Sequence, residues 1–119
     1  KTSAYIAGYY LKEKQFPEAI KYYQQLVKLE PRKASSYFSL GYAHSAAGSW
    51  DRAIENYLMA LKYDQEDDEI YANLGVAYEQ KGLYADALKA YRSAYEINPQ
   101  TKVASRIPRL RIQLMKEKK

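Results

Sequence analysis

The sequence of 119 residues contains no cysteine and a single histidine, His44. Without cysteine, the chain can form neither a disulfide framework nor a zinc–thiolate site, and its redox compartment stays undetermined. One histidine is also too few for a zinc site that needs a histidine pair. We therefore expect His44 to be a packing residue rather than a contact to a partner.

Glycine is scarce, and the spacings of the five glycines match neither a dinucleotide-binding nor a phosphate-binding loop. No serine has the flanking glycines of a hydrolase nucleophile. The acidic run at residues 64–69 matches a calcium loop only until its sixth position, where Glu69 replaces the required glycine. We expect these carboxylates to cap the helix that follows. The sequence therefore predicts no enzymatic activity, no cofactor and no metal.

Long apolar runs are absent as well, since none approaches the roughly 20 residues that a membrane span needs. The formal net charge is +5, but it is unevenly distributed. Residues 1–101 carry 12 Lys/Arg and 13 Asp/Glu, whereas residues 102–119 carry seven Lys/Arg and one Glu. Because only the tail is basic, we do not expect nucleic acid or a membrane to be the main partner.

Residues 68–101 have the pattern of one complete helix-turn-helix unit. Apolar residues in the stretch 71–78 recur at three- and four-residue steps, which is the spacing of one face of an α-helix. The stretch 87–97 repeats this spacing, and Gly82 separates the two helices. Pro99 ends the second helix, because the residue before a proline is disfavoured in the α conformation.

The same marks recur along the chain at an interval of 34 residues. Pro31 and Pro99 are separated by twice this interval, and a further step back from the middle copy reaches Ala19, Tyr23 and Leu26. The pairs separated by one interval are Gly41 and Gly75, Gly48 and Gly82, Ala53 and Ala87, Tyr57 and Tyr91, and Ala60 and Ala94.

This period, with Leu-Gly followed by Tyr, Ala, an aromatic residue and Pro, resembles the tetratricopeptide repeat family. The resemblance covers about residues 1–101. It implies an all-α fold, an α-solenoid of three helix-turn-helix units in a right-handed superhelix. The repeats expected from it are residues 1–33, 34–67 and 68–101. The chain starts at Lys1 without methionine, so we expect it to be a piece of a longer protein.

Residues 102–119 do not begin a fourth repeat, because Pro108 and Arg109 stand where Leu-Gly is needed. Their pattern predicts a basic amphipathic helix that caps the last repeat. Pro108 inside this helix is expected to cost about 3 kcal/mol through a lost backbone hydrogen bond. The apolar stripe of the predicted cap consists of Val103, Ile107, Leu110 and Leu114.

The resemblance also implies a concave groove, which the first helices of the repeats line in this family. Transferred onto this sequence, it places aromatic and small polar residues in the groove, a composition typical of protein interfaces. The open alternative is that Phe38 and Tyr42 only pack against neighbouring repeats. The expected groove residues are Tyr5, Gly8 and Lys12 in the first repeat, Phe38, Ser39, Tyr42 and Ser45 in the second, and Asn73, Val76 and Gln80 in the third.

Some members of the family hold the acidic C-termini of chaperones with a clamp of Lys, Asn and Arg side chains. Only Asn73 matches this set in type and position, so the resemblance does not favour that specialisation.

The resulting hypothesis is a non-enzymatic protein–protein interaction scaffold that binds a peptide or helix of a partner protein in the concave groove. One alternative is electrostatic docking of the basic tail to an anionic surface, either RNA or membrane headgroups. Another is self-association through the N-terminal face, where Tyr9 replaces Ala43 and Ala77 of the other copies.

Overall fold

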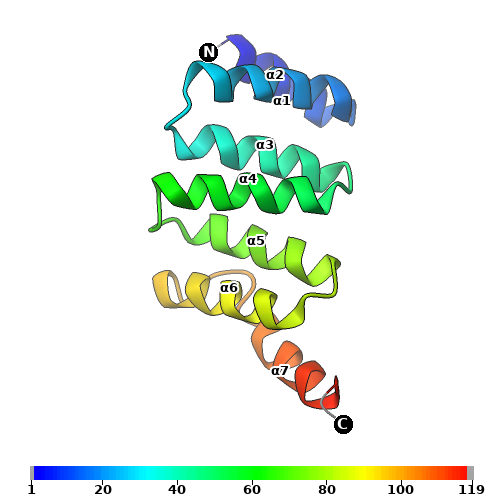
Figure 1. The fold of residues 1–119 in the computed structure, drawn as a ribbon, viewed down its shortest axis with the longest axis vertical. Coiled ribbons are helices and arrows are strands. Elements are labelled where there is room, and N and C mark those ends of the chain that lie inside the picture. Colours follow the sequence, from blue (N-terminus) through cyan, green and yellow to red (C-terminus); the bar gives the residue numbers. More distant parts are fainter. Residues whose placement is uncertain (1, 118–119) are drawn as a thin grey trace. The chain divides into compact units, whose positions relative to one another are not determined.

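The computed structural model describes residues 2–117, and this part of the chain contains seven α-helices and no strand (Figure 1). The chain divides into two compact units, Lys1–Asp64 and Gln65–Lys119. In the described part, no helix combines the length and the hydropathy needed to cross a membrane. The helices are α1 (Thr2–Lys12), α2 (Phe16–Leu29), α3 (Ala34–Ala46), α4 (Trp50–Tyr63), α5 (Asp68–Gln80), α6 (Tyr84–Ile97) and α7 (Arg106–Glu117).

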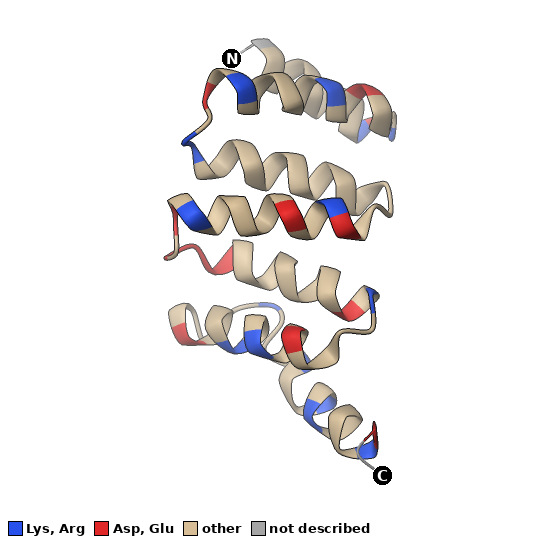
Figure 2. Ribbon diagram, in the orientation of Figure 1, with Lys and Arg blue, Asp and Glu red and all other residues tan. Residues whose placement is uncertain are grey.

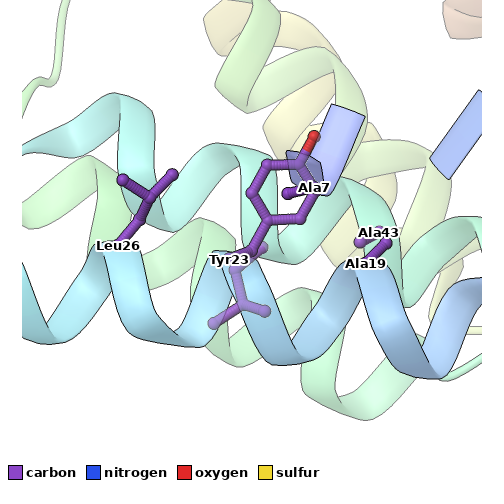
Figure 3. Packing of buried hydrophobic residues seen from close by; sticks show 6 residues of the cluster. Ala7, Ala19, Tyr23, Leu26 and Ala43 are labelled. Carbon is purple, nitrogen blue, oxygen red and sulfur yellow. The ribbon is translucent and has the colours of Figure 1, made fainter. Parts of the chain in front are cut away.

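The first unit consists of two helix pairs, in which α1 packs against α2, α2 against α3, and α3 against α4. Small residues at the contacts let the helices approach closely. Ala7, Ala19 and Ala43 are completely buried, and they pack with Tyr23 and Leu26 of α2 (Figure 3). Each helix therefore depends on its neighbours, since helices of this length are only marginally stable alone.

Local sequence signals set the helix ends. Pro17 lies in the first turn of α2, where its missing N–H costs nothing. Gly48 and Gly82 follow α3 and α5 with φ of 82° and 78°, a conformation that disfavours residues with a Cβ atom. The side chain of Asp67 caps α5 by accepting a 2.9 Å hydrogen bond from the amide of Glu69. The acidic run thus supplies the cap that its charge indicates.

Glycine also fixes the closest helix contacts. A Cβ atom on Gly41 would lie 2.8 Å from the ring of Tyr57, and one on Gly75 would lie 2.5 Å from Cδ1 of Tyr91. Real Cβ atoms do not come this close to other atoms, so the two tyrosine rings occupy the space that the glycines leave. This contact explains why glycine and tyrosine recur together at the 34-residue interval.

The second unit packs α5 against α6 and α6 against α7. Leu110 of α7 is almost completely buried with Ala87, Tyr91 and Ala94 of α6. The predicted stripe is only partly helical, because Val103 is buried in the turn before α7. The hydrophobic cluster of this unit continues through half-buried residues of α5, α6 and α7: Tyr71, Ala72, Val76, Tyr78, Tyr84, Leu88 and Ile107.

One expectation about the C-terminal helix was wrong. Because α7 begins at Arg106, Pro108 is its third residue and lies in the first turn, where no backbone hydrogen bond is lost. The expected cost of Pro108 therefore does not arise. Two cations of α7, Arg106 and Arg109, approach Glu79 of α5 to 3.1 and 3.8 Å, and the side chain of Arg109 is still 68% exposed. Lys118 and Lys119 of the predicted tail lie outside the described residues.

Candidate functional site

The first helices of the N-terminal unit present a surface that is almost free of charge. α3 carries none of the Lys, Arg, Asp and Glu residues that Figure 2 colours, and Lys12 is the one such residue within the bounds of α1. Hydroxyl groups and aromatic rings take their place. This composition separates the surface from the charged second helices of the same unit, α2 and α4.

Phe38 and Tyr42 form an aromatic pair one turn apart on α3. Their ring centroids are 6.5 Å apart with an interplanar angle of 24°. The ring of Phe38 also lies 5.7 Å from that of the buried Tyr57, so Phe38 is half-buried and rests on the core. Tyr42 is 48% exposed. In this pair, Phe38 is therefore fixed against the core, and Tyr42 is accessible to a partner.

Tyr57 of α4 contacts this pair through the ring of Phe38. Its side chain is completely buried, and its hydroxyl lies 3.0 Å from Oγ of Ser45 in a hydrogen bond. Burial raises the pKa of Tyr57 to about 12, with the Ser45 hydrogen bond acting in the opposite direction. Tyr57 therefore stays neutral at physiological pH, and Ser45 holds it in place.

A cavity of about 330 Å³ opens between the start of α1, the end of α2 and the start of α3. Ala4 and Leu26 contribute apolar surface, Glu30 and Lys33 contribute charged groups, and the predicted residue Ser39 lies in the wall. Oγ of Ser36 donates a 3.4 Å hydrogen bond to Glu30 inside the same wall. The sequence carries a signal for this cavity, because Ala4 is small where the second repeat has Phe38.

The other groove residues expected in the first repeat lie on α1. Tyr5 is 82% exposed, and Lys12 is exposed as well. Gly8 has open space around it, since a Cβ atom there would meet no heavy atom within 4 Å. Tyr5 and Lys12 are accessible to a partner, whereas Gly8 leaves a gap between them.

In the second unit, the three expected residues on α5 have different environments. Asn73 donates a 2.9 Å hydrogen bond to the carbonyl of Glu69, Val76 packs into the hydrophobic cluster, and Gln80 is exposed. Of the three, Gln80 is exposed and Asn73 and Val76 are half-buried. Glu79, which belongs to no sequence motif, accepts a 2.7 Å hydrogen bond from the hydroxyl of Tyr91.

His44 is buried, as expected of a packing residue. Its Nδ1 has no hydrogen-bond partner among the described residues. Burial lowers the pKa of His44, the charge of Arg52 lowers it further, and Glu55 acts in the opposite direction. His44 is therefore neutral near pH 7. Because its side chain is buried, it does not belong to the uncharged surface of α1 and α3.

Comparison with known proteins identifies the fold. The family model for the tetratricopeptide repeat matches residues 6–61 and 38–101, which together cover more than half of the chain. Over 44 residues the chain is 39% identical to the cell division cycle protein 16 homologs of Homo sapiens and Mus musculus. This match covers 37% of the chain but spans only 7% of the length of those relatives.

Solved structures agree over nearly the whole chain. The Arabidopsis OM64 TPR domain is similar with a TM-score of 0.86 and 25% sequence identity, and the match covers 92% of each chain. The first TPR of Spaghetti (RPAP3), bound to the HSP90 peptide SRMEEVD, is similar with a TM-score of 0.91. That match has 16% identity and covers 96% of this chain and 91% of the other. The chain belongs to the tetratricopeptide repeat family, and its fold is an all-α helical-repeat solenoid.

Proposed function

We propose that the chain is a non-enzymatic interaction scaffold whose N-terminal unit binds an extended, largely uncharged peptide segment of a partner protein. The observation that carries this proposal is the uncharged face of α3, with the rings of Phe38 and Tyr42 supported by Tyr57. Exposed aromatic side chains on a rigid support supply contact area at a small entropic cost.

The similarity to a structure that holds a peptide supports the coarse part of this proposal. The first TPR of Spaghetti binds an HSP90 peptide, SRMEEVD, which contains three acidic residues. The face of α3 has no cation to pair with such carboxylates. We therefore propose recognition of apolar and aromatic side chains by the face of α3.

The arrangement of the C-terminal helix argues against the basic tail as the main binding element. Arg106 and Arg109 lie 3.1 and 3.8 Å from carboxylate oxygens of Glu79, which offsets part of the positive charge of the tail. A groove that uses aromatic contacts should also bind with little dependence on salt, whereas electrostatic docking should weaken steeply.

The test is selection of random peptides displayed on phage against the full chain, followed by affinity measurements with the selected synthetic peptides. We expect affinity to change less than about threefold between about 0.15 and about 1 M salt, because the contacts are apolar. Tyr42→Ala should weaken binding by at least about tenfold, or roughly 1.4 kcal/mol. Tyr95→Ala, which removes a tyrosine of similar exposure from α6, is the matched control and should leave affinity unchanged.

For Phe38→Ala, stability must be measured as well as binding, because the ring of Phe38 contacts Tyr57 and its removal should also lower stability. Circular dichroism melts distinguish a lost contact from a lost fold. Peptides whose binding depends on salt and on Arg109, but is indifferent to Tyr42, would overturn the proposal.

A further inference from the structure

The cavity of the N-terminal unit lies where the first repeat lacks an aromatic ring that the second repeat has. Ala4 of α1 lies one 34-residue interval before Phe38 of α3. Tyr23 of α2 lies one interval before Tyr57 of α4. In the second repeat the ring of Phe38 is 5.7 Å from that of Tyr57. In the first repeat Ala4 brings no ring, and both Ala4 and Tyr23 line the cavity. The cavity therefore takes the place of an aromatic side chain.

The walls of this cavity come from three helices of one unit. α1 packs against α2, and α2 packs against α3. All the lining residues belong to the described part of the chain, and they lie on these helices and in the loop between α2 and α3. Because Glu30, Lys33 and Ser35 of the lining are exposed, the cavity opens to the surface. A side chain of a partner can therefore enter it.

The lining changes from apolar to polar toward the surface. Tyr23 and Leu26 are buried and project from the same face of α2 (Figure 3). Ser36 is buried as well, and its hydroxyl donates a 3.4 Å hydrogen bond to Glu30. Glu30 and Lys33 are exposed and form an ion pair of 3.6 Å. A side chain that fits is therefore apolar where it enters the cavity and polar at the mouth.

The two charges at the mouth determine which polar group fits. A carboxylate or a phosphate would be attracted by Lys33 and repelled by Glu30, so it would gain little. A phenol hydroxyl is neutral, and it can donate to a carboxylate and accept from an ammonium group at the same time. Tyrosine combines this hydroxyl with the ring that the first repeat lacks.

The cavity has the size and the place to hold one side chain of a bound peptide. Its volume of about 330 Å³ is at the lower end of the range of ligand pockets. Ser39 in its wall is three residues before Tyr42, so the two are neighbours on the surface of α3. An extended peptide that contacts Tyr42 can therefore place a side chain in the cavity.

We propose that this cavity is a specificity pocket for one tyrosine side chain of the peptide that the N-terminal unit binds. The ring of that tyrosine packs on Tyr23, as Phe38 packs on Tyr57 in the second repeat. Its hydroxyl forms a hydrogen bond with Glu30 at the mouth. The inference rests on the proposed function, and it names a residue that the peptide must contain.

The test combines a substitution in the cavity with substitutions in the peptides selected from the phage library. Ala4→Phe introduces the ring that the second repeat has, and so fills the cavity from within. Replacing the tyrosine of the peptide by alanine should lower affinity for the parent at least about tenfold. The same replacement should matter less than about twofold on Ala4→Phe, because its pocket is already filled. Thermal melts should show that Ala4→Phe is at least as stable as the parent.

Two comparisons sharpen this test. Replacing the tyrosine of the peptide by phenylalanine should lower affinity about three- to tenfold, because the hydrogen bond at the mouth is lost. Ala85→Phe, which adds the same ring to an exposed alanine of α6, is the matched control. It should leave both the affinity and the effect of the peptide's tyrosine unchanged. Equal binding of the tyrosine and phenylalanine peptides, or an equal loss with Ala85→Phe, would overturn the proposal.

Failure of the pocket and failure of the proposed function are distinguishable. Selected peptides that need Tyr42, but whose tyrosines keep their effect on Ala4→Phe, would overturn the pocket and leave the proposed function in place. A selection without any binding peptide would contradict the proposed function, and NMR titration with N-acetyltyrosinamide then tests the pocket directly. The amide signals of Ser36 and Ser39 should shift in the parent and not in Ala4→Phe. Absence of these shifts in the parent would overturn the pocket.

Discussion

The hydroxyl of Tyr91 donates a 2.7 Å hydrogen bond to the carboxylate of Glu79, which lies 12 residues earlier. Tyr57 and Ser45 are joined by a hydrogen bond of 3.0 Å over the same separation in the preceding repeat. In both repeats a buried tyrosine of the second helix is therefore tied to the last turn of the first helix. In the second unit the acceptor is the carboxylate of Glu79, which also attracts Arg106 and Arg109 of α7.

Glu79 should accordingly be the residue that fastens α7. Glu79→Gln keeps an acceptor for Tyr91 but removes the charge that attracts Arg106 and Arg109. We expect the free energy of unfolding to fall by about 1 to 2 kcal/mol, mainly through Arg106, because Glu79 and Arg106 are 22% and 38% exposed, whereas Arg109 is 68% exposed. Urea unfolding of Glu79→Gln, Arg106→Gln and the double variant measures the coupling. Glu96→Gln on α6 is the control, and purely additive losses would contradict the shared contact.

Glycine substitutions should separate close helix contacts from ordinary helical positions. Gly75→Ala should destabilise by about 1 to 3 kcal/mol, because the new methyl group meets the ring of Tyr91. That ring cannot swing aside, since it is buried and its hydroxyl is bonded to Glu79. Gly8→Ala should stabilise by roughly 0.5 to 1 kcal/mol, because it removes a flexible residue from a helix with free space around it.

Thermal and urea unfolding give both values, and Gly41→Ala should fall between them, because its methyl group would be 2.8 Å from Tyr57. If Gly75→Ala were as stable as the parent, the packing of α5 on α6 would have to be looser than described.

The fold could be predicted from the sequence because the 34-residue repeat constrains the turns, the helix contacts and the core together. Gly75 and Tyr91 recur at the interval of Gly41 and Tyr57, and each pair makes one helix contact. The helix-breaking glycines and the alanine contacts obey the same interval. A pattern that specifies turns, contacts and core together leaves few alternative folds. The boundaries of the individual repeats and the handedness of the superhelix stay predictions.

The details of the site followed less well, because they depend on side chains that are distant in sequence. The pairing of Glu79 with Arg106 joins residues 27 apart that belong to no motif. The start of α7 could not be read from its apolar stripe, because Val103 contributes to the core from a turn. Ser45 is an expected groove residue, and no sequence pattern indicated that its hydroxyl also forms a hydrogen bond with that of Tyr57. Helical periodicity predicts a face, whereas the partner of each polar atom depends on three-dimensional packing.

The capping role of α7 predicts a large difference between two of its apolar residues. Leu110 is 3% exposed and packs with α6, whereas Ile112 is 55% exposed. We expect Leu110→Ala to cost about 2 to 4 kcal/mol, because it leaves a cavity in the cluster. Ile112→Ala should change the free energy of unfolding by no more than about 0.5 kcal/mol. Equal effects in chemical unfolding would show that α7 does not cover the last repeat.

His44 predicts how stability depends on pH on the acid side of neutrality. Because burial lowers its pKa below the ordinary value of 6.5, the folded state binds a proton less readily than the unfolded state. The stabilisation from neutral His44 is therefore complete above pH 6.5, and it is lost as the pH falls from there toward the folded-state pKa. The unfolding free energy should fall by at most about 1.4 kcal/mol for each pH unit in this window.

His44→Tyr should remove this pH dependence. Tyrosine stands at the equivalent positions, Tyr10 and Tyr78, so the fold accommodates its ring. The substitution also removes the buried Nδ1 that has no partner among the described residues, and such an atom costs about 1 to 3 kcal/mol. We expect urea unfolding at about pH 7.5 and about pH 5.5 to give a smaller difference for the variant than for the parent. Carboxylates that titrate in both proteins cancel in this comparison. An unchanged difference would mean that the imidazole reaches water when it is protonated.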